Sequence, residues 1–173
     1  MEKIFVFDNF LTENELDTAI SIINSKKWSC NHRSLGKELY ETPFWSMDLN
    51  DESHFSIHIK NIIEKTMKKK FKLQRVYANG NTFGQDGSFH RDSDKKNSYT
   101  FCIYFTNIHS DFIETAGGHI FFKFKNLKYN ICYEPIFNRG IFFPSNYLHK
   151  GTSFSRYIMD MRICVSWKLE EEI

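Results

Sequence analysis

GQDGSFHRDSD (Gly84–Asp94) places one histidine and several carboxylates close to two glycines, and an apolar stretch follows it. This segment is either an ordinary polar turn before a strand or part of a metal site built on His90 and Asp92. Side chains two residues apart on an extended chain point to the same face, so these two can hold adjacent corners of a metal ion. A second His-x-Asp triplet occurs at His109–Asp111. One triplet is therefore weak evidence, and a third ligand has to come from elsewhere.

His149 is the best candidate for that third ligand. It lies in FFPSNYLHKG (Phe142–Gly151), after an apolar strand and a Pro-Ser turn, which predicts a position at a strand end or rim. Taken alone it would be an ordinary surface or core histidine. Two histidines and one carboxylate on one face of an octahedron leave three positions open, which suits non-haem Fe(II). His54 and His58 share a helix face but lack the glutamate of a metalloprotease motif, and we expect them to be surface or interface residues.

Arg162 is a further candidate, because it lies in the alternating apolar segment MRICVSWKL (Met161–Leu169). An arginine on such a strand is costly to bury unless it meets an anion. Its planar guanidinium suits a carboxylate ligand. The alternative is a structural ion pair with an aspartate or glutamate of the chain.

The composition indicates a globular protein. The chain has 173 residues, enough for one domain with one core, and 41% of them are hydrophobic. Its 18 phenylalanines favour a β-rich core, and its net charge of +2 is too small to indicate a nucleic-acid partner. No apolar run has the length of a membrane span, and we expect a cytoplasmic protein. Cys102 and Cys164 lie inside apolar runs and are expected to be buried free thiols.

The hydrophobic pattern predicts helices first and strands afterwards. A short strand in IFVFD precedes a helix over Leu11–Lys27, in which Thr12 and Glu15 form a capping box. A second helix is expected to begin with Asp51 as its cap. Beyond residue 72, six short β-like runs are separated by Gly, Asn, Asp and Pro. We therefore expect an α+β fold, with a sandwich or jelly roll covered on one side by the helices.

The second half of the chain resembles the iron- and 2-oxoglutarate-dependent dioxygenases, and more narrowly their prolyl 4-hydroxylase type. The resemblance is carried in order by VYANGNTFGQDGSFHRDSD, YTFCIYFTN, GGHIFF, EPIFNRGIFFPSNYLHKG and MRICVSWKL. It implies a double-stranded β-helix, a cupin-like jelly roll, with supporting N-terminal helices. Residues 73–169 would be its core and residues 1–72 its helical support, within a single domain over 1–173.

The resemblance also implies the roles of individual residues. His90, Asp92 and His149 would bind Fe(II). Arg162 and Tyr104 would bind the distal carboxylate of 2-oxoglutarate, and two further aromatic side chains, Tyr77 and Trp167, are each expected either beside the site or in the core. The implied reaction consumes O₂ and 2-oxoglutarate, releases succinate and CO₂, and hydroxylates prolyl residues of a peptide or protein; ascorbate is a further cofactor implied for this type.

Several alternatives stay open at this stage. The same cofactor chemistry could act on a small molecule or nucleic acid, or the chain could be a metal-binding jelly roll without catalysis, or a structural domain without metal. Arg156 lies closer to His149 than Arg162 does and is a rival for the cosubstrate, although its segment is predicted to be a loop. The Trp28–Leu49 segment, with Tyr40 and Phe44, is expected either to form two strands with a lid or groove, or to pack at the sheet edge. The oligomeric state is left undetermined.

Overall fold

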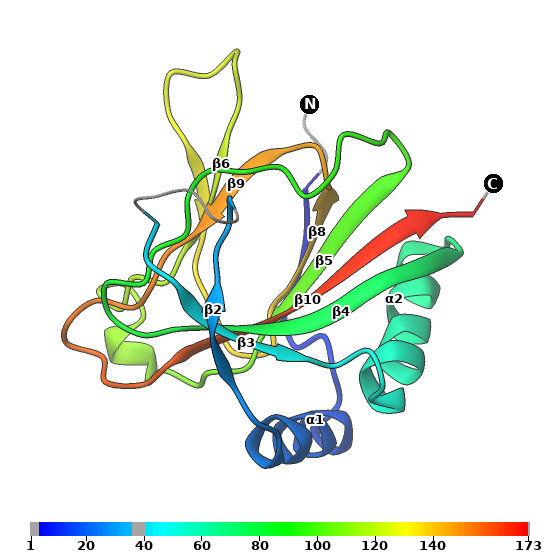
Figure 1. Cartoon of the computed structure of the whole chain (residues 1–173), viewed down its shortest axis with the longest axis horizontal. Helices are drawn as coiled ribbons and strands as arrows, with labels where there is room; N and C mark the ends of the chain where they lie inside the picture. The colour runs from blue at the N-terminus through cyan, green and yellow to red at the C-terminus, as the bar shows by residue number, and fades with distance from the viewer. Residues whose placement is uncertain (1–3, 36–40, 173) are drawn as a thin grey trace.

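Two antiparallel β-sheets form the body of the protein (Figure 1). The computed structural model describes residues 4–35 and 41–172, so Tyr40 lies outside the described residues. The larger sheet has the strand order β1-β8-β5-β10-β4-β3-β2. Its strands are β1 (Phe5–Phe7), β2 (Ser29–His32), β3 (Phe44–Asp48), β4 (Phe71–Asn81), β5 (Ser98–Tyr104), β8 (Gly140–Pro144) and β10 (Arg162–Glu171). The smaller sheet has the order β7-β6-β9 and consists of β6 (Ile120–Lys123), β7 (Ile131–Tyr133) and β9 (Leu148–Gly151).

The helices follow the predicted pattern with one correction. Helix α1 (Glu13–Ser25) begins at the predicted capping box, in which the Glu15 carboxylate accepts the Thr12 backbone N–H at 2.8 Å. The second helix begins later than predicted, so Asp51 as its cap was wrong. Its N-cap position is Ser53, whose side chain makes no capping hydrogen bond, and it starts as a π-helical segment η1 (His54–Ile59) before continuing as α2 (Lys60–Met67).

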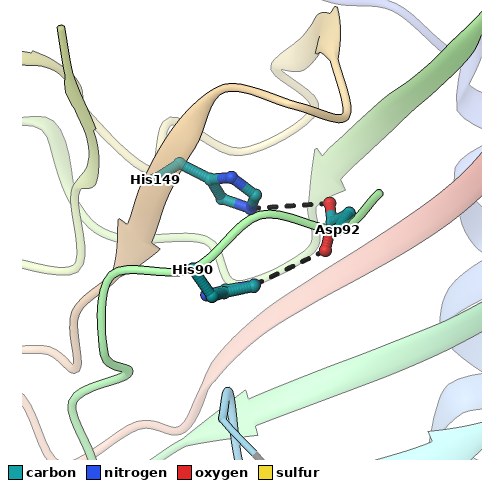
Figure 2. Close-up of side chains that lie close together, drawn as sticks. All are labelled: His90, Asp92 and His149. Atoms are coloured by element: carbon teal, nitrogen blue, oxygen red, sulfur yellow. Dashed lines mark ion pairs between the residues drawn. The ribbon is translucent and has the colours of Figure 1, made fainter. Parts of the chain in front are cut away.

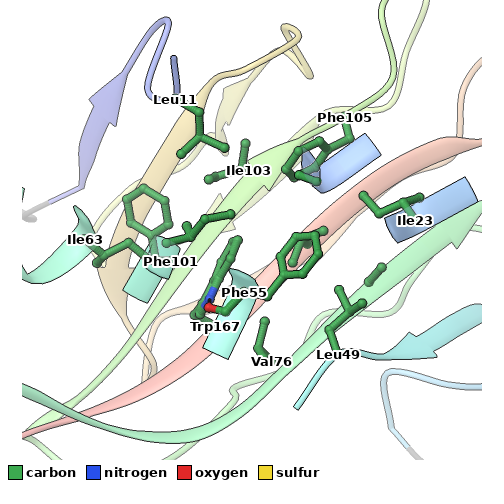
Figure 3. Packing of buried hydrophobic residues seen from close by; sticks show 14 of the residues in the cluster. Leu11, Ile23, Leu49, Phe55, Ile63, Val76, Phe101, Ile103, Phe105 and Trp167 are labelled. Carbon is green, nitrogen blue, oxygen red and sulfur yellow. Dashed lines mark hydrogen bonds between the residues drawn. The ribbon is translucent and has the colours of Figure 1, made fainter. Parts of the chain in front are cut away.

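The helices cover one face of the larger sheet and bury its apolar side chains (Figure 3). Ile23 of α1, Phe55 of η1 and Ile63 of α2 pack with Phe101 of β5 and Trp167 of β10. All five side chains are almost completely buried. Trp167 belongs to this core, where its indole N–H donates to the Phe55 carbonyl at 2.8 Å, and it does not line the cavity described below.

The opposite face of the larger sheet meets the smaller sheet. Phe122 of β6 packs against Phe143 of β8 with ring centroids 4.9 Å apart, and Cys102 and Cys164 are buried in the same cluster as free thiols, as predicted. This second cluster is smaller than the first and leaves room for a cavity beside it.

The predicted α+β fold with a double-stranded β-helix is confirmed. The N-terminal region also contributes strands, because β1 extends one edge of the larger sheet and the β2–β3 hairpin extends the other. Strand β9 was not predicted, since only the Pro-Ser turn and the position of His149 after it were evident in the sequence. None of the helices within residues 4–35 and 41–172 is long and apolar enough to cross a membrane.

Candidate metal and cofactor site

One rung of antiparallel backbone pairing brings His90 and His149 together. The His90 N–H donates to the His149 carbonyl at 2.9 Å, and the His149 N–H donates to the His90 carbonyl at 3.0 Å. His149 lies on β9, whereas His90 lies in the connection between β4 and β5. That connection is fastened to β9 a second time, because the Gly87 N–H donates to the Gly151 carbonyl at 2.9 Å.

Each histidine ring is oriented by the carbonyl of the residue two positions before it. Nδ1 of His90 lies 2.9 Å from the Ser88 carbonyl oxygen, and Nδ1 of His149 lies 2.9 Å from that of Tyr147. An Nδ1–H donated to a carbonyl leaves the lone pair on Nε2, where a metal binds. Burial lowers the pKa of His149 to about 4, so this imidazole is neutral at neutral pH.

Asp92 completes the predicted triad (Figure 2). Its Oδ1 lies 3.4 Å from Nε2 of His90, and its Oδ2 lies 3.5 Å from Nε2 of His149. The three potential ligand atoms lie within 4.8 Å of one another. Ligand atoms about 2.1 Å from a metal and at right angles to each other are about 3 Å apart, so the three side chains fit one ion after a small adjustment.

A hydroxyl and an ammonium hold the Asp92 carboxylate in place. Thr100 donates its hydroxyl to Oδ2 at 2.6 Å, and Nζ of Lys168 lies 2.5 Å from the same oxygen. Burial alone would raise the pKa of Asp92, but the charge of Lys168 and its hydrogen bond to Oδ2 hold the pKa well below its usual range. Because both donors use Oδ2, Oδ1 is the oxygen that keeps a lone pair for a metal.

Arg162 lies in the same cavity as the triad, is 4% exposed, and forms no ion pair with any described carboxylate. Its Nε donates to the Gly118 carbonyl at 2.6 Å, one terminal nitrogen lies 3.3 Å from Oδ1 of Asn81, and the other lies 3.4 Å from the Tyr104 hydroxyl oxygen. Burial raises the pKa of Tyr104 well above its usual value, so its O–H remains available as a donor. A buried cation beside a free hydroxyl donor fits an anionic ligand such as a carboxylate.

Two glycines allow this arrangement around the guanidinium. Gly118 has a φ of +74°, and a Cβ there would lie 2.7 Å from the Phe154 ring. Only glycine adopts this backbone readily, and the turn directs the Gly118 carbonyl at Arg162. A Cβ on Gly151 would lie 3.3 Å from the guanidinium, so the absence of a side chain there leaves the guanidinium its space.

A cavity of about 280 Å³ joins the triad to Arg162. Its walls come from both sheets and from the β4–β5 connection. The lining includes Tyr77, which thus takes the position beside the site of the two left open for it, and also His32 and Phe44 from the β2–β3 hairpin. The predicted lid or groove segment therefore contributes to the cavity through these side chains, whereas Trp28 packs against the large core cluster.

The other histidine and arginine candidates lie elsewhere. His54 and His58 contact the Glu15 carbonyl and carboxylate of α1, which fastens η1 to that helix. His109 and Asp111 are exposed. Arg156, the rival of Arg162, is exposed and contacts the Tyr157 hydroxyl at 2.9 Å outside the cavity.

Lys168 is the main residue that the sequence analysis missed. Its position was evident in the alternation of β10, where it shares a face with Arg162, Cys164 and Ser166. A lysine close to the end of a strand is usually solvated, so its position in the sequence does not by itself indicate a buried site residue.

No protein-family model matches this chain, and no curated protein matches its sequence. Solved structures match its fold along nearly the whole chain. A prolyl hydroxylase from Trichoplax adhaerens, in complex with a peptide fragment of the hypoxia inducible factor oxygen degradation domain, superposes with a TM-score of 0.73. The alignment covers 99% of this chain and 84% of that one, at 13% identity.

The chain has the fold of the 2-oxoglutarate–Fe(II) oxygenases. A prolyl-4-hydroxylase from Pseudomonas putida matches with a TM-score of 0.68 and 10% identity, covering 100% of this chain and 95% of that one. HygX from Streptomyces hygroscopicus, solved with nickel, 2-oxoglutarate and hygromycin B, matches with a TM-score of 0.70 and 7% identity, covering 98% of this chain and 83% of that one. The 2-oxoglutarate–Fe(II) oxygenase fold thus occurs with both peptide and small-molecule ligands among these neighbours.

Proposed function

We propose that this protein is an Fe(II)- and 2-oxoglutarate-dependent dioxygenase that hydroxylates prolyl residues of a peptide or protein. One observation supports the cofactor chemistry above all: a two-histidine, one-carboxylate group and a buried arginine that pairs with no described carboxylate line the same cavity. A binding module that holds only a metal has no need for a buried anion site beside it. When bound, Fe(II) and 2-oxoglutarate supply the oxidising chemistry, with O₂ consumed and succinate and CO₂ released.

In this proposal the triad residues bind the metal through defined atoms. Nε2 of His90, Nε2 of His149 and Oδ1 of Asp92 are the ligands, and the backbone rung between the histidines fixes their separation. Thr100 and Lys168 restrain the second carboxylate oxygen, so Asp92 binds through one oxygen and leaves three positions open.

The cosubstrate is held at its far end by Arg162 and Tyr104. The guanidinium supplies the positive charge, and the Tyr104 hydroxyl donates to the same carboxylate. Gly118 and Asn81 fix the orientation of the guanidinium through its remaining nitrogens. Tyr77 lines the cavity from β4, the strand that pairs with β10 in the same sheet. Burial of these groups excludes water from the reacting end.

The choice of a prolyl substrate rests on similarity. Two of the structural neighbours are prolyl hydroxylases, and one of them is bound to a peptide fragment. In this chain the β2–β3 hairpin contributes His32 and Phe44 to the open side of the cavity, where an extended segment would lie.

An anaerobic titration tests the cofactor chemistry. Addition of 2-oxoglutarate to the Fe(II)-loaded protein should produce a weak visible metal-to-ligand charge-transfer band. His90→Ala should abolish the band by removing a ligand, and Arg162→Ala should require much more 2-oxoglutarate to produce it. Arg156→Ala is the matched control and should behave as the wild type. A wild-type protein that binds metal but gives no band would contradict the proposal.

A turnover assay tests the substrate. The aerobic protein with Fe(II), 2-oxoglutarate and ascorbate should form succinate faster with a proline-containing peptide than with the same peptide carrying alanine instead. Mass spectrometry should locate one added oxygen on the proline. A charge-transfer band together with no proline-dependent turnover would retain the cofactor chemistry and reject the prolyl substrate.

A further inference from the structure

The cavity contains more positive charge than its proposed cofactors require. Among the described ionised side chains that line it, one is a carboxylate, Asp92, and the cations are Arg33, Arg75, Arg91, Arg162 and Lys168. The whole chain has a net charge of only +2, so this excess is local. A local excess of one sign around a pocket attracts ligands of the opposite sign.

The proposed cofactors account for two of these cations. Lys168 is paired with Asp92, and Arg162 is assigned to the distal carboxylate of 2-oxoglutarate. With one carboxylate of 2-oxoglutarate paired with Arg162, a divalent metal, 2-oxoglutarate, Asp92, Lys168 and Arg162 together still carry one net positive charge. Arg33, Arg75 and Arg91 are therefore left without an anion in the loaded site.

These three arginines are held by contacts that leave their charge unpaired. Nε of Arg33 donates to the Glu41 carbonyl at 3.2 Å, and Nε of Arg91 donates to the Asn146 carbonyl at 3.0 Å. The guanidinium of Arg75 lies over the Tyr77 ring, 4.6 Å from its centroid. None of the three forms an ion pair with a carboxylate in the described part of the chain, whereas Arg139 pairs with both Asp8 and Glu134.

The carboxylate of Glu41, whose backbone carbonyl accepts from Arg33, is bonded to backbone N–H groups. The Glu41 carboxylate accepts the Leu35 N–H at 2.9 Å and the Ser88 N–H at 3.1 Å. These bonds fasten the segment after β2 to the β4–β5 connection. Among residues 4–35 and 41–172, no carboxylate pairs with the terminal nitrogens of the three guanidinium groups.

The arginines come from three separate segments. Arg33 follows β2 and is half-buried, Arg75 is exposed on β4, and Arg91 is exposed between two proposed metal ligands. A chain with several carboxylates can reach all three while it presents one residue to the metal. A compact ligand with one anionic group would use fewer of them.

Building on the proposed function, we propose that the substrate is an acidic peptide segment, whose aspartate or glutamate side chains bind Arg33, Arg75 and Arg91. The residue to be oxidised lies between these carboxylates and enters the cavity above the triad. Arginine suits this role because its planar fork binds carboxylates through two parallel hydrogen bonds.

Peptide binding to the anaerobic Fe(II)- and 2-oxoglutarate-loaded protein tests the inference. Three fluorescein-labelled peptides of equal length carry one central proline flanked by glutamate, glutamine or lysine. At low salt the glutamate peptide should bind about tenfold more tightly than the glutamine peptide, because exposed ion pairs each contribute up to about fivefold. The lysine peptide should bind more weakly than both, and the preference should shrink as salt is added.

Variants that each remove one positive charge test which arginines contribute to binding of the glutamate peptide. Arg33→Gln, Arg75→Gln and Arg91→Gln should each weaken binding of the glutamate peptide about threefold and leave the glutamine peptide unaffected. Arg156→Gln is the matched control, because Arg156 is also exposed and lies over a tyrosine ring, with its guanidinium 5.0 Å from the Tyr157 centroid. It should change neither peptide.

The outcomes separate this inference from the proposed function, because the charge-transfer band is recorded on the same samples. A missing band would overturn the proposed function. A normal band with equal binding of the glutamate and glutamine peptides, or with no peptide binding, would overturn the acidic-peptide inference alone. Displacement of the glutamate peptide by a lower concentration of a single-stranded oligonucleotide than of unlabelled peptide would also overturn it.

Discussion

The two faces of strand β10 are equally buried and chemically opposite. Ile163, Val165, Trp167 and Leu169 face the helices and belong to the large apolar core or pack against it. Arg162, Cys164, Ser166 and Lys168 alternate with them and line the cavity. From Cys164 to Lys168 no residue on either face is more than 9% exposed.

The two faces of β10 have different roles. The helix-covered face contributes to the stability of the fold, and the cavity face carries the polar groups proposed to bind ligands. The helix-covered face buries apolar area without leaving polar atoms unpaired, and that contributes directly to the free energy of folding. The cavity face buries two cations, which costs free energy unless they meet anions or hydrogen-bond acceptors. Substitutions on the first face should therefore change stability, and substitutions on the second should change ligand binding.

The largest effect is expected on the core face. Trp167→Ala should lower the free energy of unfolding by about 3–5 kcal/mol, because it leaves a large cavity and an unpaired Phe55 carbonyl. Chemical denaturation measures this loss. Trp45→Ala, at a half-buried position on β3, is the control and should cost clearly less. A loss below about 1 kcal/mol for Trp167→Ala would remove the distinction between the faces.

A substitution on the cavity face should change metal affinity instead of stability. Thr100→Val keeps the shape of a fully buried side chain but removes the hydrogen bond to Oδ2 of Asp92. The affinity for Mn(II), used as a redox-stable probe, should fall about tenfold because the carboxylate loses part of its orientation. Thr106→Val removes a comparable hydroxyl, bonded to the Met161 carbonyl outside the site, and should leave metal affinity unchanged. Equal affinities for both variants would assign Thr100 a purely structural role.

The smallest effect is expected at Glu64, a buried carboxylate of the helical layer. It accepts the Phe71 N–H at 2.7 Å and pairs with Lys60 at 2.7 Å. Burial opposes its ionisation, but these partners hold its pKa below the ordinary value of 4.5. The stabilisation is therefore complete above pH 4.5 and is lost as the pH falls through the folded-state pKa.

Glu64→Gln should accordingly lower the free energy of unfolding by about 1 kcal/mol at pH 7. The difference from wild type should shrink at pH 3, where the wild-type carboxylate is also neutral. Denaturation curves at both pH values measure this, and the affinity for Mn(II) should not change. A difference that is the same at both pH values would exclude the charge of Glu64 as its cause.

Much of this architecture could be predicted from the sequence, because the helix start and most of the strands depend on local sequence patterns. The capping box of α1 and the period-two segments of β4, β5 and β10 depend on neighbouring residues. Strand β9 could not be predicted in this way, since its four residues are extended through pairing with β6, far away in the sequence.

The site was predicted through its motifs, and the errors have physical causes. His90, Asp92, His149 and Arg162 meet around one cavity as the order of the motifs suggested. The sequence did not determine whether Trp167 faces the cavity or the core, because an aromatic side chain suits either face of a sheet. The contact between Lys168 and Asp92 depends on which residues of β5 and β10 lie opposite each other, and composition alone does not give that register.

The ammonium of Lys168 is a counterion for the Asp92 carboxylate that the chain itself supplies. Many small metal-binding domains unfold without their ion, because the ion is needed to hold together groups that repel one another or carry unbalanced charge. In this chain the Asp92 carboxylate already has a positive partner, and the histidines are joined by the backbone. The Asp92 carboxylate is therefore paired within the chain itself, and we expect the ion to exchange without unfolding of the domain.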